Sequence, residues 1–380
     1  MQKKSLTLIK GGVLQNPNES EQKKNVLIQG DKIVDITDET PDNTMIVDAE
    51  GCFVTPGLID QHLHGGYGCN FNTADPETII NFLTQLPKHG ITSVCPTIMT
   101  DTPKNIKEQI EKIKDAKAKL PAASAKIVGI NLEGPFINPE FKGAHPEELC
   151  LQPTVQNYRE LEDDLIKIIT IAPELDENFE LTKYLAGKGV IISAGHSNAD
   201  REVFLQAVAA GLRQVTHIFN AMPPLCHRTP GIIGNSLVND EVCAEVIADH
   251  HHLHPDIVKL ILRSKPEDKV ILISDSLPLA HSNEDSAIFG GQKIFKKGGI
   301  AVNEAGNFAG SLMFLDAVIR KNLAIASFSK LLTYCVLNPA QNLKLKDTGY
   351  LAKGMNADIT LWNTSSLEIK STFTNGHQVF

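Results

Sequence analysis

Two histidines separated by one residue, His62 and His64, follow an apolar stretch and precede the pair Gly65 and Gly66. In a β-strand, residues i and i+2 project from the same face. Two imidazoles on one face can bind a metal ion, and the glycines let the chain turn away without crowding that ion. Because the pattern is short, ordinary polar residues at a strand end are the alternative explanation until the rest of the chain is considered.

Four further titratable residues stand directly after short apolar runs. With the run that precedes each, they are Glu133 (127–132), His196 (190–193, after Ala194 and Gly195), His217 (214–216) and Asp275 (270–274). Taken singly, such a residue is more often a helix N-cap or a solvated loop residue. Taken together, imidazoles and carboxylates are the ligands of a Zn²⁺-like ion, and a catalytic site keeps one position open for water.

Asp275 differs from the others in the chemistry it could perform. A metal-dependent hydrolase needs a group that takes a proton from water and returns it to the leaving group. A carboxylate at the end of the last strand, facing the ion, could do both. Pro278 makes a regular helix start awkward at this point, so we favour a catalytic role over a helix cap.

Short apolar runs alternate with amphipathic helices through the middle of the chain. The predicted strands cover residues 57–60, 93–96, 127–132, 168–172, 190–193, 214–216, 244–248 and 270–274. Helices are predicted over 76–88, along the apolar stripe of Ile106, Ile110 and Ile113, and over 200–210 and 255–263. Eight βα units predict an α/β fold, a (β/α)8 TIM-type barrel with its active site at the carboxyl ends of the strands.

Both ends of the chain have a different, strand-rich texture. Strands are predicted over 6–9, 25–29, 32–36 and 45–48, and again over 358–362, 367–370 and 378–380, with a hairpin turn at Gly30 and Asp31. We expect the two ends to pair into one small β-sandwich beside the barrel. The predicted domains are therefore 1–55 and 349–380 for the β domain and 56–348 for the barrel.

The composition narrows the class of protein. Of 380 residues, 42% are hydrophobic and 21% charged, and the formal net charge of −9 argues against a nucleic-acid-binding surface. No apolar stretch reaches the length of about 18 residues that a membrane span needs. The seven cysteines are odd in number and widely spaced, and Lys10 ends the first apolar run too early for a signal peptide. We therefore expect reduced thiols and a cytoplasmic location.

Longer strings around the candidate residues resemble the amidohydrolase superfamily and, within it, the family of N-acetylglucosamine-6-phosphate deacetylases. The resemblance covers nearly the whole chain in order. Its strings include Pro56-Gly57-Leu58-Ile59-Asp60, Glu133-Gly134-Pro135-Phe136, Lys142-Gly143-Ala144-His145, Gly195-His196-Ser197, Ser274-Asp275 and Ala309-Gly310-Ser311. The most specific of them is His217-Ile218-Phe219-Asn220-Ala221-Met222.

This resemblance implies a role for individual residues. The metal ligands would be Glu133, His196 and His217, and the catalytic residues would be Asp275 as general base and then acid, with His145 near the substrate carbonyl. The substrate-binding positions would be Ala144, His145, Asn220, Ala221, Arg228, Asp249, His252, Phe308, Ala309 and Gly310. Among these, Arg228 and His252 would contact phosphate. Some family members keep both histidines at the first strand end and others lack them, so His62 and His64 leave one metal or two as open alternatives.

The resemblance also implies a reaction and its partners. We expect metal-dependent hydrolysis of N-acetyl-D-glucosamine 6-phosphate to D-glucosamine 6-phosphate and acetate, in amino-sugar catabolism and recycling. Zn²⁺ is the first expectation for the cofactor, with Fe²⁺, Mn²⁺ and Co²⁺ as alternatives because their ligand preferences overlap. The expected partners are the phosphorylated sugar and a second copy of the chain in a homodimer, in which a phosphate-pocket residue can come from the neighbouring subunit. Neither nucleic acid nor a membrane is expected.

Other readings of the residues stay open. Another amidohydrolase could act on a different N-acyl or cyclic amide, or on a nucleobase, although the fourth predicted strand is followed by Ala172, Pro173 and Glu174 where a bridging lysine would be needed. A barrel that has become a binding protein is a third reading, against which the metal ligands and Asp275 argue. The histidine cluster from His250 to His254 could form an additional metal site, but we expect one histidine to contact substrate and the others to be loop or core residues. Ser276 and Leu277 also depart from the family's pattern and could reshape the wall near the acetyl group.

Overall fold

Eight parallel strands from the middle of the chain form a barrel in the computed structural model, which describes residues 6–380. The strands are β7 (Leu58–Leu63), β10 (Ile91–Met99), β12 (Ile130–Glu133), β13 (Ile166–Ile171), β14 (Ile191–Ala194), β15 (Gln214–Val215), β16 (Cys243–Ile247) and β17 (Val270–Ile273). They are hydrogen-bonded in that order, from β7 beside β10 to β16 beside β17. At the mouth, the Asp275 backbone N–H donates to the His62 carbonyl over 2.9 Å and so draws β17 against β7. All eight predicted strands are confirmed.

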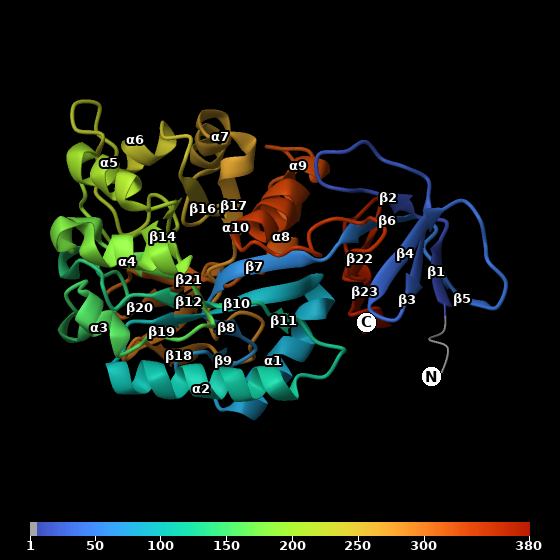
Figure 1. Cartoon of the computed structure of the whole chain (residues 1–380), viewed down its shortest axis with the longest axis horizontal. Helices are drawn as coiled ribbons and strands as arrows, with labels where there is room; N and C mark the ends of the chain where they lie inside the picture. Colours follow the sequence, from blue (N-terminus) through green and yellow to red (C-terminus); the bar gives the residue numbers. More distant parts are fainter. Residues whose placement is uncertain (1–5) are drawn as a thin grey trace.

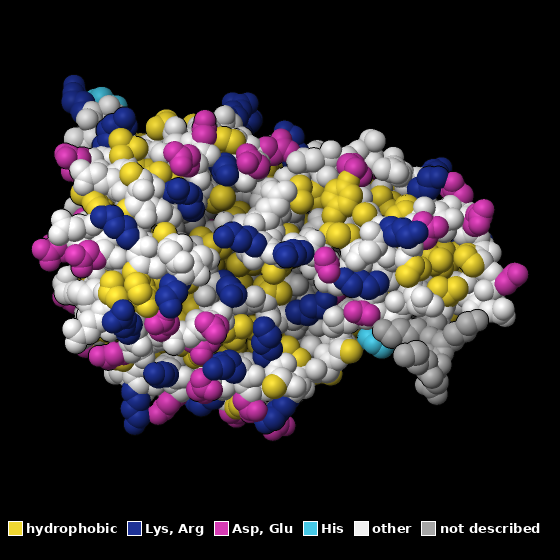
Figure 2. All heavy atoms as spheres, in the orientation of Figure 1, with side chains coloured by type: hydrophobic (Ala, Val, Ile, Leu, Met, Phe, Trp, Pro, Cys, Tyr) yellow, Lys and Arg dark blue, Asp and Glu magenta, His cyan; other side chains and the backbone are white. Residues whose placement is uncertain are grey.

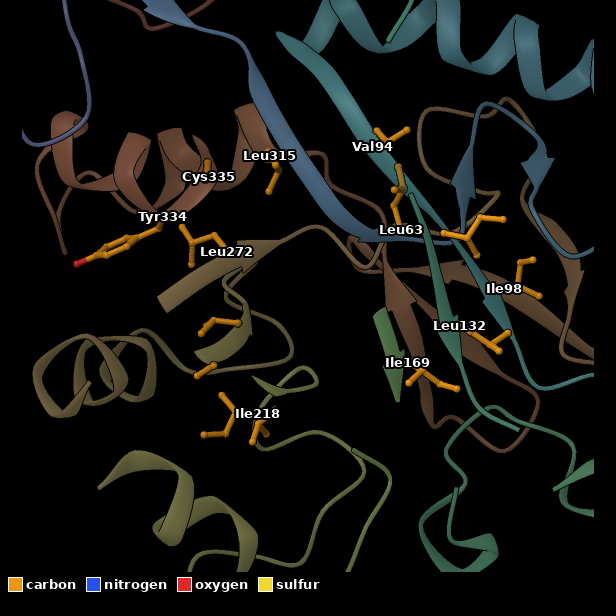
Figure 3. Close-up of a cluster of buried hydrophobic side chains, with 14 of the residues drawn as sticks. Leu63, Val94, Ile98, Leu132, Ile169, Ile218, Leu272, Leu315, Tyr334 and Cys335 are labelled. Carbon is orange, nitrogen blue, oxygen red and sulfur yellow. The ribbon is translucent and has the colours of Figure 1, made fainter. Parts of the chain in front are cut away.

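The period-two alternation of the strands separates the core from the site. Leu63 and Leu132 point outward into the apolar layer between the strands and the helices, together with Val94, Ile98 and Leu272 (Figure 3). Their neighbours His62, His64 and Glu133 therefore project into the barrel. Every residue of β7 is buried, as expected for a strand covered on both faces.

Helices form the outer layer of the barrel (Figure 1). They are α1 (Pro76–Gln85), α2 (Pro103–Lys119), α3 (Val155–Arg159), α4 (Glu180–Lys188), α5 (Arg201–Ala210), α6 (Gly231–Leu237), α7 (Pro255–Ser264), α8 (Leu315–Lys321), α9 (Phe328–Leu332) and α10 (Asn338–Asn342). The four predicted helices correspond to α1, α2, α5 and α7. Asp75 and Thr102 cap α1 and α2, each before a proline that suits the first helical position.

The third predicted strand is interrupted in the structure. The run 127–132 is divided into β11 (Lys126–Ile127) and β12, with Val128 and Gly129 between them. The Val128 N–H bonds to the Val94 carbonyl, whereas the Ile130 N–H bonds to the Leu165 carbonyl. The chain therefore changes hydrogen-bonding partner at Gly129, and only β12 lies between β10 and β13.

The two ends of the chain come together in a separate β unit, at the right of Figure 1. One sheet has the order β4 (Lys32–Thr37), β3 (Asn25–Gln29), β1 (Leu6–Lys10), β5 (Thr44–Asp48). The other has the order β2 (Val13–Leu14), β6 (Cys52–Pro56), β22 (Ile359–Asn363), β23 (Ile369–Thr374), β24 (His377–Gln378). Ile9, Val26 and Ile28 pack with Val54 and Ile359 in a core of their own, which confirms the predicted sandwich of both termini. The limits 1–55, 56–348 and 349–380 are kept as a proposal.

A four-stranded antiparallel sheet follows Asp275, and no strand was predicted there. It consists of β18 (Ser286–Phe289), β19 (Gln292–Lys297), β20 (Ile300–Asn303) and β21 (Phe308–Ser311). Two further short strands, β8 (Gly65–Gly66) and β9 (Cys69–Asn70), form a hairpin directly after His64. The turns Gly290-Gly291 and Gly298-Gly299 are hairpin signals in the sequence, but the strand between them, β19, is short and largely polar. This sheet brings Phe289 and β21 to the mouth of the barrel.

The surface is charged but mixed. On the face drawn in Figure 2, Lys and Arg side chains are interspersed with Asp and Glu rather than gathered into a basic stripe. None of the helices in residues 6–380 is long and apolar enough to cross a membrane. All seven cysteines are free thiols. Residues 1–5, the basic start of the N-terminal segment, lie outside the described part of the chain.

Candidate active site

Three side chains from three strand ends converge on one point inside the barrel mouth. Glu133 Oε1 lies 2.8 Å from His217 Nε2 and 3.2 Å from His196 Nε2, and the two Nε2 atoms are 3.2 Å apart. His196 Nδ1 donates to the Phe141 carbonyl over 2.8 Å, so its Nε2 carries a lone pair. A lone pair, a second imidazole nitrogen and a carboxylate oxygen held this closely fit a divalent cation.

A second group of ligand atoms lies beside the first. His62, His64 and Asp275 place one nitrogen or oxygen each within 4.8 Å of one another. His64 Nε2 is 3.3 Å from Asp275 Oδ1, and His62 Nε2 is 3.5 Å from the same oxygen. His62 Nε2 is buried and has no hydrogen-bond partner. A buried imidazole nitrogen that faces two carboxylates and has no hydrogen-bond partner is suited to bind a cation.

Glu133 joins the two groups. Its Oε1 faces His196 and His217, whereas its Oε2 lies 3.0 Å from His64 Nε2 and 3.4 Å from His145 Nε2. A single carboxylate between two ligand sets can contact an ion in either set through a different oxygen. The arrangement thus accommodates one ion or two.

The charges at this centre are strongly interdependent. Burial opposes ionisation of Glu133, but the charge of His62 and the contacts with the rings of His145, His196 and His217 hold its pKa well below the usual range. Burial likewise opposes ionisation of Asp275, and His64 and His62 lower its pKa. Both carboxylates are therefore ionised at neutral pH, as a ligand and a proton acceptor must be.

His145 is suited to donate a hydrogen bond. Its Nδ1 accepts from the Thr100 backbone N–H over 3.3 Å and lies 2.8 Å from Thr100 Oγ1. This contact assigns the proton of the neutral ring to Nε2. Burial lowers the pKa of His145 to about 4, so the ring is neutral at pH 7. A neutral imidazole with Nε2–H at the site can polarise a carbonyl without carrying a charge of its own.

Three functional side chains sit on strained backbone. His196, His217 and Asp275 all have positive φ, at 50°, 26° and 50°. For residues with a Cβ, such conformations are sparsely populated and cost of order 1–3 kcal/mol each. All three directly follow barrel strands, so the strain turns their side chains toward the centre rather than along the strand direction.

A pocket with an empty volume of about 620 Å³ opens above the candidate metal ligands. Of the predicted residues, it is lined by Glu133, His196, His217, His64, Asp275, His145, Ala144, Asn220, Ala221, His252, Phe308, Ala309 and Gly310. Gly143, Ile247 and Phe289 complete the lining. His62 lies below the pocket, fully buried. Nearly all predicted site residues are therefore brought together.

His252 and Asp249 act as a pair at the rim. His252 Nδ1 donates to Asp249 Oδ2 over 2.8 Å, which leaves Nε2 for the pocket that the ring lines. Burial disfavours the charged imidazole, but the hydrogen bond and charge of Asp249 raise the pKa of His252 above 6.5. The pKa of Asp249 falls to about 2, because contacts from His252 outweigh its burial. The pair thus presents a cationic donor at one end of the pocket.

The neighbouring histidines have other partners. His254 caps α7 by accepting from the Asp256 N–H, and His250 lies 3.0 Å from Asn322 Oδ1. Neither they nor His251 line the pocket. Leu277, the departure from the family pattern, is buried beside Met99 and Phe289 behind the pocket wall.

Arg228 is not brought to the site of its own chain. It is exposed on the loop 223–230 between β15 and α6, which projects at the upper left of Figure 1. The tip of the same projection carries side chains coloured as Lys or Arg and as His in Figure 2. Within residues 6–380, Arg228 does not contribute to the pocket lining.

Several supporting residues were missed from the sequence. Glu174 accepts hydrogen bonds from Asn138, Ser197 and Asn198, and so ties the loop that carries His196 to the loop after β12. Glu245 accepts a hydrogen bond from His62 Nδ1 over 3.0 Å. The signal for Glu245 was a lone charge in the otherwise apolar strand 244–248, which a barrel strand tolerates only when the charge is paired.

Comparison with known proteins places these features in one family. Residues 53–379 match the model of the amidohydrolase family. The chain is 33% identical to N-acetylglucosamine-6-phosphate deacetylase of Bacillus subtilis, over 98% of this chain and 97% of that protein. The deacetylase of Thermotoga maritima superposes with a TM-score of 0.89 at 29% identity, covering 98% of this chain and 99% of that one. A mutant of the Mycobacterium smegmatis deacetylase, in complex with N-acetyl-D-glucosamine-6-phosphate, superposes with a TM-score of 0.90 at 26% identity, and 99% of both chains is covered. The chain belongs to the amidohydrolase family, among its N-acetylglucosamine-6-phosphate deacetylases.

Proposed function

We propose that the chain hydrolyses N-acetyl-D-glucosamine 6-phosphate to D-glucosamine 6-phosphate and acetate in a metal-dependent reaction of amino-sugar catabolism and recycling. The observation that carries this proposal is the convergence of Glu133, His196 and His217 opposite Asp275, inside one pocket. The relatives that bear the name of this activity match nearly the whole chain.

The site supplies what amide hydrolysis requires. A bound divalent ion acidifies the attacking water and stabilises the negative charge that develops on the amide oxygen. Asp275 is ionised and takes the proton of the water, then passes it to the departing nitrogen, which would otherwise leave as an unstable anion. His145 Nε2–H, held by Thr100, donates to the carbonyl oxygen.

The remaining pocket residues suit a phosphorylated sugar. Phe308, Ala309 and Gly310 of β21 form one wall, and Asn220 and Ala221 another. The charged His252–Asp249 pair lies at the rim, where a phosphate would be met by a cationic donor. One positive group is a weak phosphate site by itself, so a second cation is needed.

We infer that the second cation is Arg228 of a partner chain in a homodimer. The exposed loop that carries it is flanked by apolar side chains in solvent, with Leu225 42% and Val238 72% exposed. Exposed apolar groups beside a projecting loop favour burial against a second copy of the chain. The seven free thiols suit a cytoplasmic location.

For the cofactor, we propose Zn²⁺ first, with Fe²⁺, Mn²⁺ or Co²⁺ as alternatives, because mixed imidazole and carboxylate ligands suit all four. The principal ion belongs to Glu133, His196 and His217. With two ions per chain rather than one, the second belongs to His62, His64 and Asp275. Glu133 is within reach of both.

Hydrolysis of a different N-acyl or cyclic amide is not favoured. The dihydroorotase-like chemistry of cyclic amides uses a bridging lysine after the fourth strand, where this chain has Glu174. That carboxylate is engaged by Ser197 Oγ and the Asn198 N–H, each over 2.6 Å. It therefore holds a loop and does not reach the pocket.

Elemental analysis of the purified chain, with acetate release measured on N-acetylglucosamine 6-phosphate, tests the proposal. We expect at least one divalent ion per chain and turnover that a chelator abolishes and added metal restores. Turnover that persists at full rate after complete metal removal would exclude the metal-dependent reaction. Release of acetate from unphosphorylated N-acetylglucosamine at an equal kcat/KM would exclude the assigned substrate.

A further inference from the structure

Beneath the metal ligands, a buried polar cluster fills the floor of the barrel. Its centre is Glu245 on β16, which is 0% exposed. Glu245 Oε1 accepts from Gln61 Nε2 over 2.7 Å and from Gln214 Nε2 over 2.9 Å, and its Oε2 lies 3.0 Å from His62 Nδ1. A buried carboxylate at which three donors converge is fully satisfied only if His62 Nδ1 carries a proton.

Asn342, below the cluster, sets the orientation of the amide groups of Gln61 and Gln214. Asn342 Nδ2, on α10, donates to Gln214 Oε1 over 2.8 Å and to Gln61 Oε1 over 3.1 Å. Gln61 Nε2 also donates to Gln214 Oε1 over 3.0 Å. The amide oxygens therefore face the NH₂ of Asn342, and both amide nitrogens face Glu245. One N–H of each glutamine and His62 Nδ1 therefore converge on the Glu245 carboxylate.

We infer that Glu245 is a positioning residue that keeps His62 in the tautomer able to bind metal. With the proton on Nδ1 and donated to Glu245, the lone pair of His62 lies on Nε2, which faces Asp275 and Glu133 at 3.5 and 3.6 Å. This inference rests on the proposed metal-dependent function and concerns only the second ion, at His62, His64 and Asp275. A carboxylate behind a metal-bound histidine fixes its orientation and increases its basicity.

The cluster makes a sharp prediction for Glu245→Gln. If the new amide kept its oxygen on His62, its NH₂ would face the NH₂ groups of Gln61 and Gln214. If it kept its oxygen on those two donors, its NH₂ would face His62 Nδ1, which would then become an acceptor and move the proton to Nε2. Because Asn342 holds Gln61 and Gln214 in place, the second arrangement prevails, and Nε2 is lost as a ligand.

A second substitution, Asn342→Asp at the bottom of the cluster, should restore binding of the second ion in Glu245→Gln. Asn342→Asp alone places a carboxylate against the amide oxygens, so both glutamines turn their NH₂ groups away from Glu245. In the double variant Glu245→Gln with Asn342→Asp, Gln61 and Gln214 turn together, and their oxygens accept from the NH₂ of the amide introduced at position 245. The oxygen of that introduced amide then accepts again from His62 Nδ1.

Metal binding measured without turnover tests the inference. Apo protein is titrated with Co²⁺, followed by its absorption bands, and metal per chain is determined by elemental analysis. The native chain should bind two equivalents. Glu245→Gln should keep one equivalent and weaken the other by about 10–100-fold, and the double variant should recover it. Asn342→Asp alone leaves Glu245 Oε2 to accept from His62 Nδ1 and should keep both equivalents.

Asp176→Asn is the matched control. Asp176 is also buried and also accepts three hydrogen bonds, from the Leu181 N–H, the Thr182 N–H and Thr182 Oγ1, but it stands at the start of α4. It should lower the melting temperature while keeping both equivalents. If Glu245→Gln does not fold, Glu245→Asp carries the same prediction, because the shorter carboxylate keeps the charge but draws back from His62 Nδ1.

The inference is overturned if the native chain binds one equivalent only, if Glu245→Gln binds the second as tightly as the native chain, or if Asp176→Asn also loses it. Failure of the proposed function is a separate result, namely no acetate release from N-acetylglucosamine 6-phosphate by fully loaded native protein. The titration does not depend on that assay.

Discussion

At the scale of single residues, the site separates two carboxylates by role. Glu133 is surrounded by imidazoles on both oxygens, which suits a metal ligand. The Asp275 carboxylate lies beside His64 and His62, in the second ligand group, and also faces the open pocket, which suits proton transfer. Both are ionised, so their neighbours rather than their charge distinguish them.

Asp275→Asn should lower kcat by about 10²–10⁴-fold, the range of general acid–base catalysis, because an amide cannot accept the proton of the attacking water. The group of Glu133, His196 and His217 is untouched, so that ion should stay bound. Stopped assays of acetate release, with metal analysis of the same sample, measure both effects. A variant that turns over at nearly the native rate would show that Asp275 is not the base.

His252 should impose a pH dependence on phosphate binding. Asp249 raises the pKa of His252 above 6.5, so the ring is cationic below that raised value and loses its charge as pH increases through it. The kcat/KM for the phosphorylated sugar should therefore fall on the alkaline side, by up to about tenfold per pH unit where phosphate binding requires the cation. His252→Gln should remove this step.

The control for that profile is unphosphorylated N-acetylglucosamine. It shares the amide and the Asp275 chemistry but has no phosphate to meet the imidazolium. An identical alkaline fall for both sugars, retained in His252→Gln, would assign the titration to another group.

At the scale of elements, the barrel supplies the ligands and the inserted sheet supplies the wall. The ligands sit at the ends of β7, β12, β14, β15 and β17. The wall depends on β21, where Gly310 has φ of +152° and passes close to Asp275. A Cβ at Gly310 would lie 3.0 Å from the Asp275 carbonyl and 2.8 Å from Leu277 Cγ. Only a glycine allows the strand to lie this near the catalytic residue.

Gly310→Ala should therefore displace Asp275 and lower kcat/KM by roughly 10–100-fold, since small misplacements of a reacting group have effects of this size. Gly306→Ala is the matched control. Gly306 lies in the same hairpin with φ of +82° but has no atom within 4 Å of its added Cβ. It should lose stability without a comparable loss of activity, as judged by melting temperature and steady-state kinetics. Equal losses of activity in both variants would contradict the contact.

At the scale of the whole molecule, the proposed phosphate site is incomplete within one chain. His252 stands at the pocket, whereas Arg228 projects from the barrel on an exposed loop. Each phosphate site would be complete if two copies of the chain each placed the loop 223–230 at the pocket of the other. The β-sandwich of the two termini lies at the opposite end of the molecule from this loop (Figure 1).

Arg228→Ala should raise KM for the phosphorylated sugar by roughly 10–100-fold, the loss expected for charge-assisted hydrogen bonds. The KM for the unphosphorylated sugar should stay nearly unchanged.

Mixing two impaired variants gives a stronger test of the partner's contribution. In a mixed dimer of Arg228→Ala and Asp275→Asn, one pocket has its own Asp275 and receives Arg228 from its partner. Activity at low substrate should therefore reappear on mixing, and its absence, in dimers shown to exchange, would place Arg228 outside the partner's pocket.

Much of the fold could be predicted because its signals are local. Apolar runs such as 190–193 and the stripe of Ile106, Ile110 and Ile113 report their own periodicity, whatever they pack against. The β18–β21 sheet was missed because its strands are short and only weakly patterned, and its core of Leu277, Phe289 and Ile294 forms only after folding. Arg228 had the right residue type, but its own chain does not bring it to the pocket.

The sequence alone determined the barrel and supplied the candidate metal ligands, because strand periodicity and side-chain chemistry are properties of individual residues and their near neighbours. His62, Glu133, His196, His217 and Asp275 each followed a strand, and the carboxyl ends of parallel strands meet at one rim. Only the tertiary structure decided that Glu133 lies between two ligand groups and that Glu245 supports His62. The second of these relations joins residues more than a hundred positions apart through a hydrogen bond of 3.0 Å, and such contacts depend on how the barrel closes.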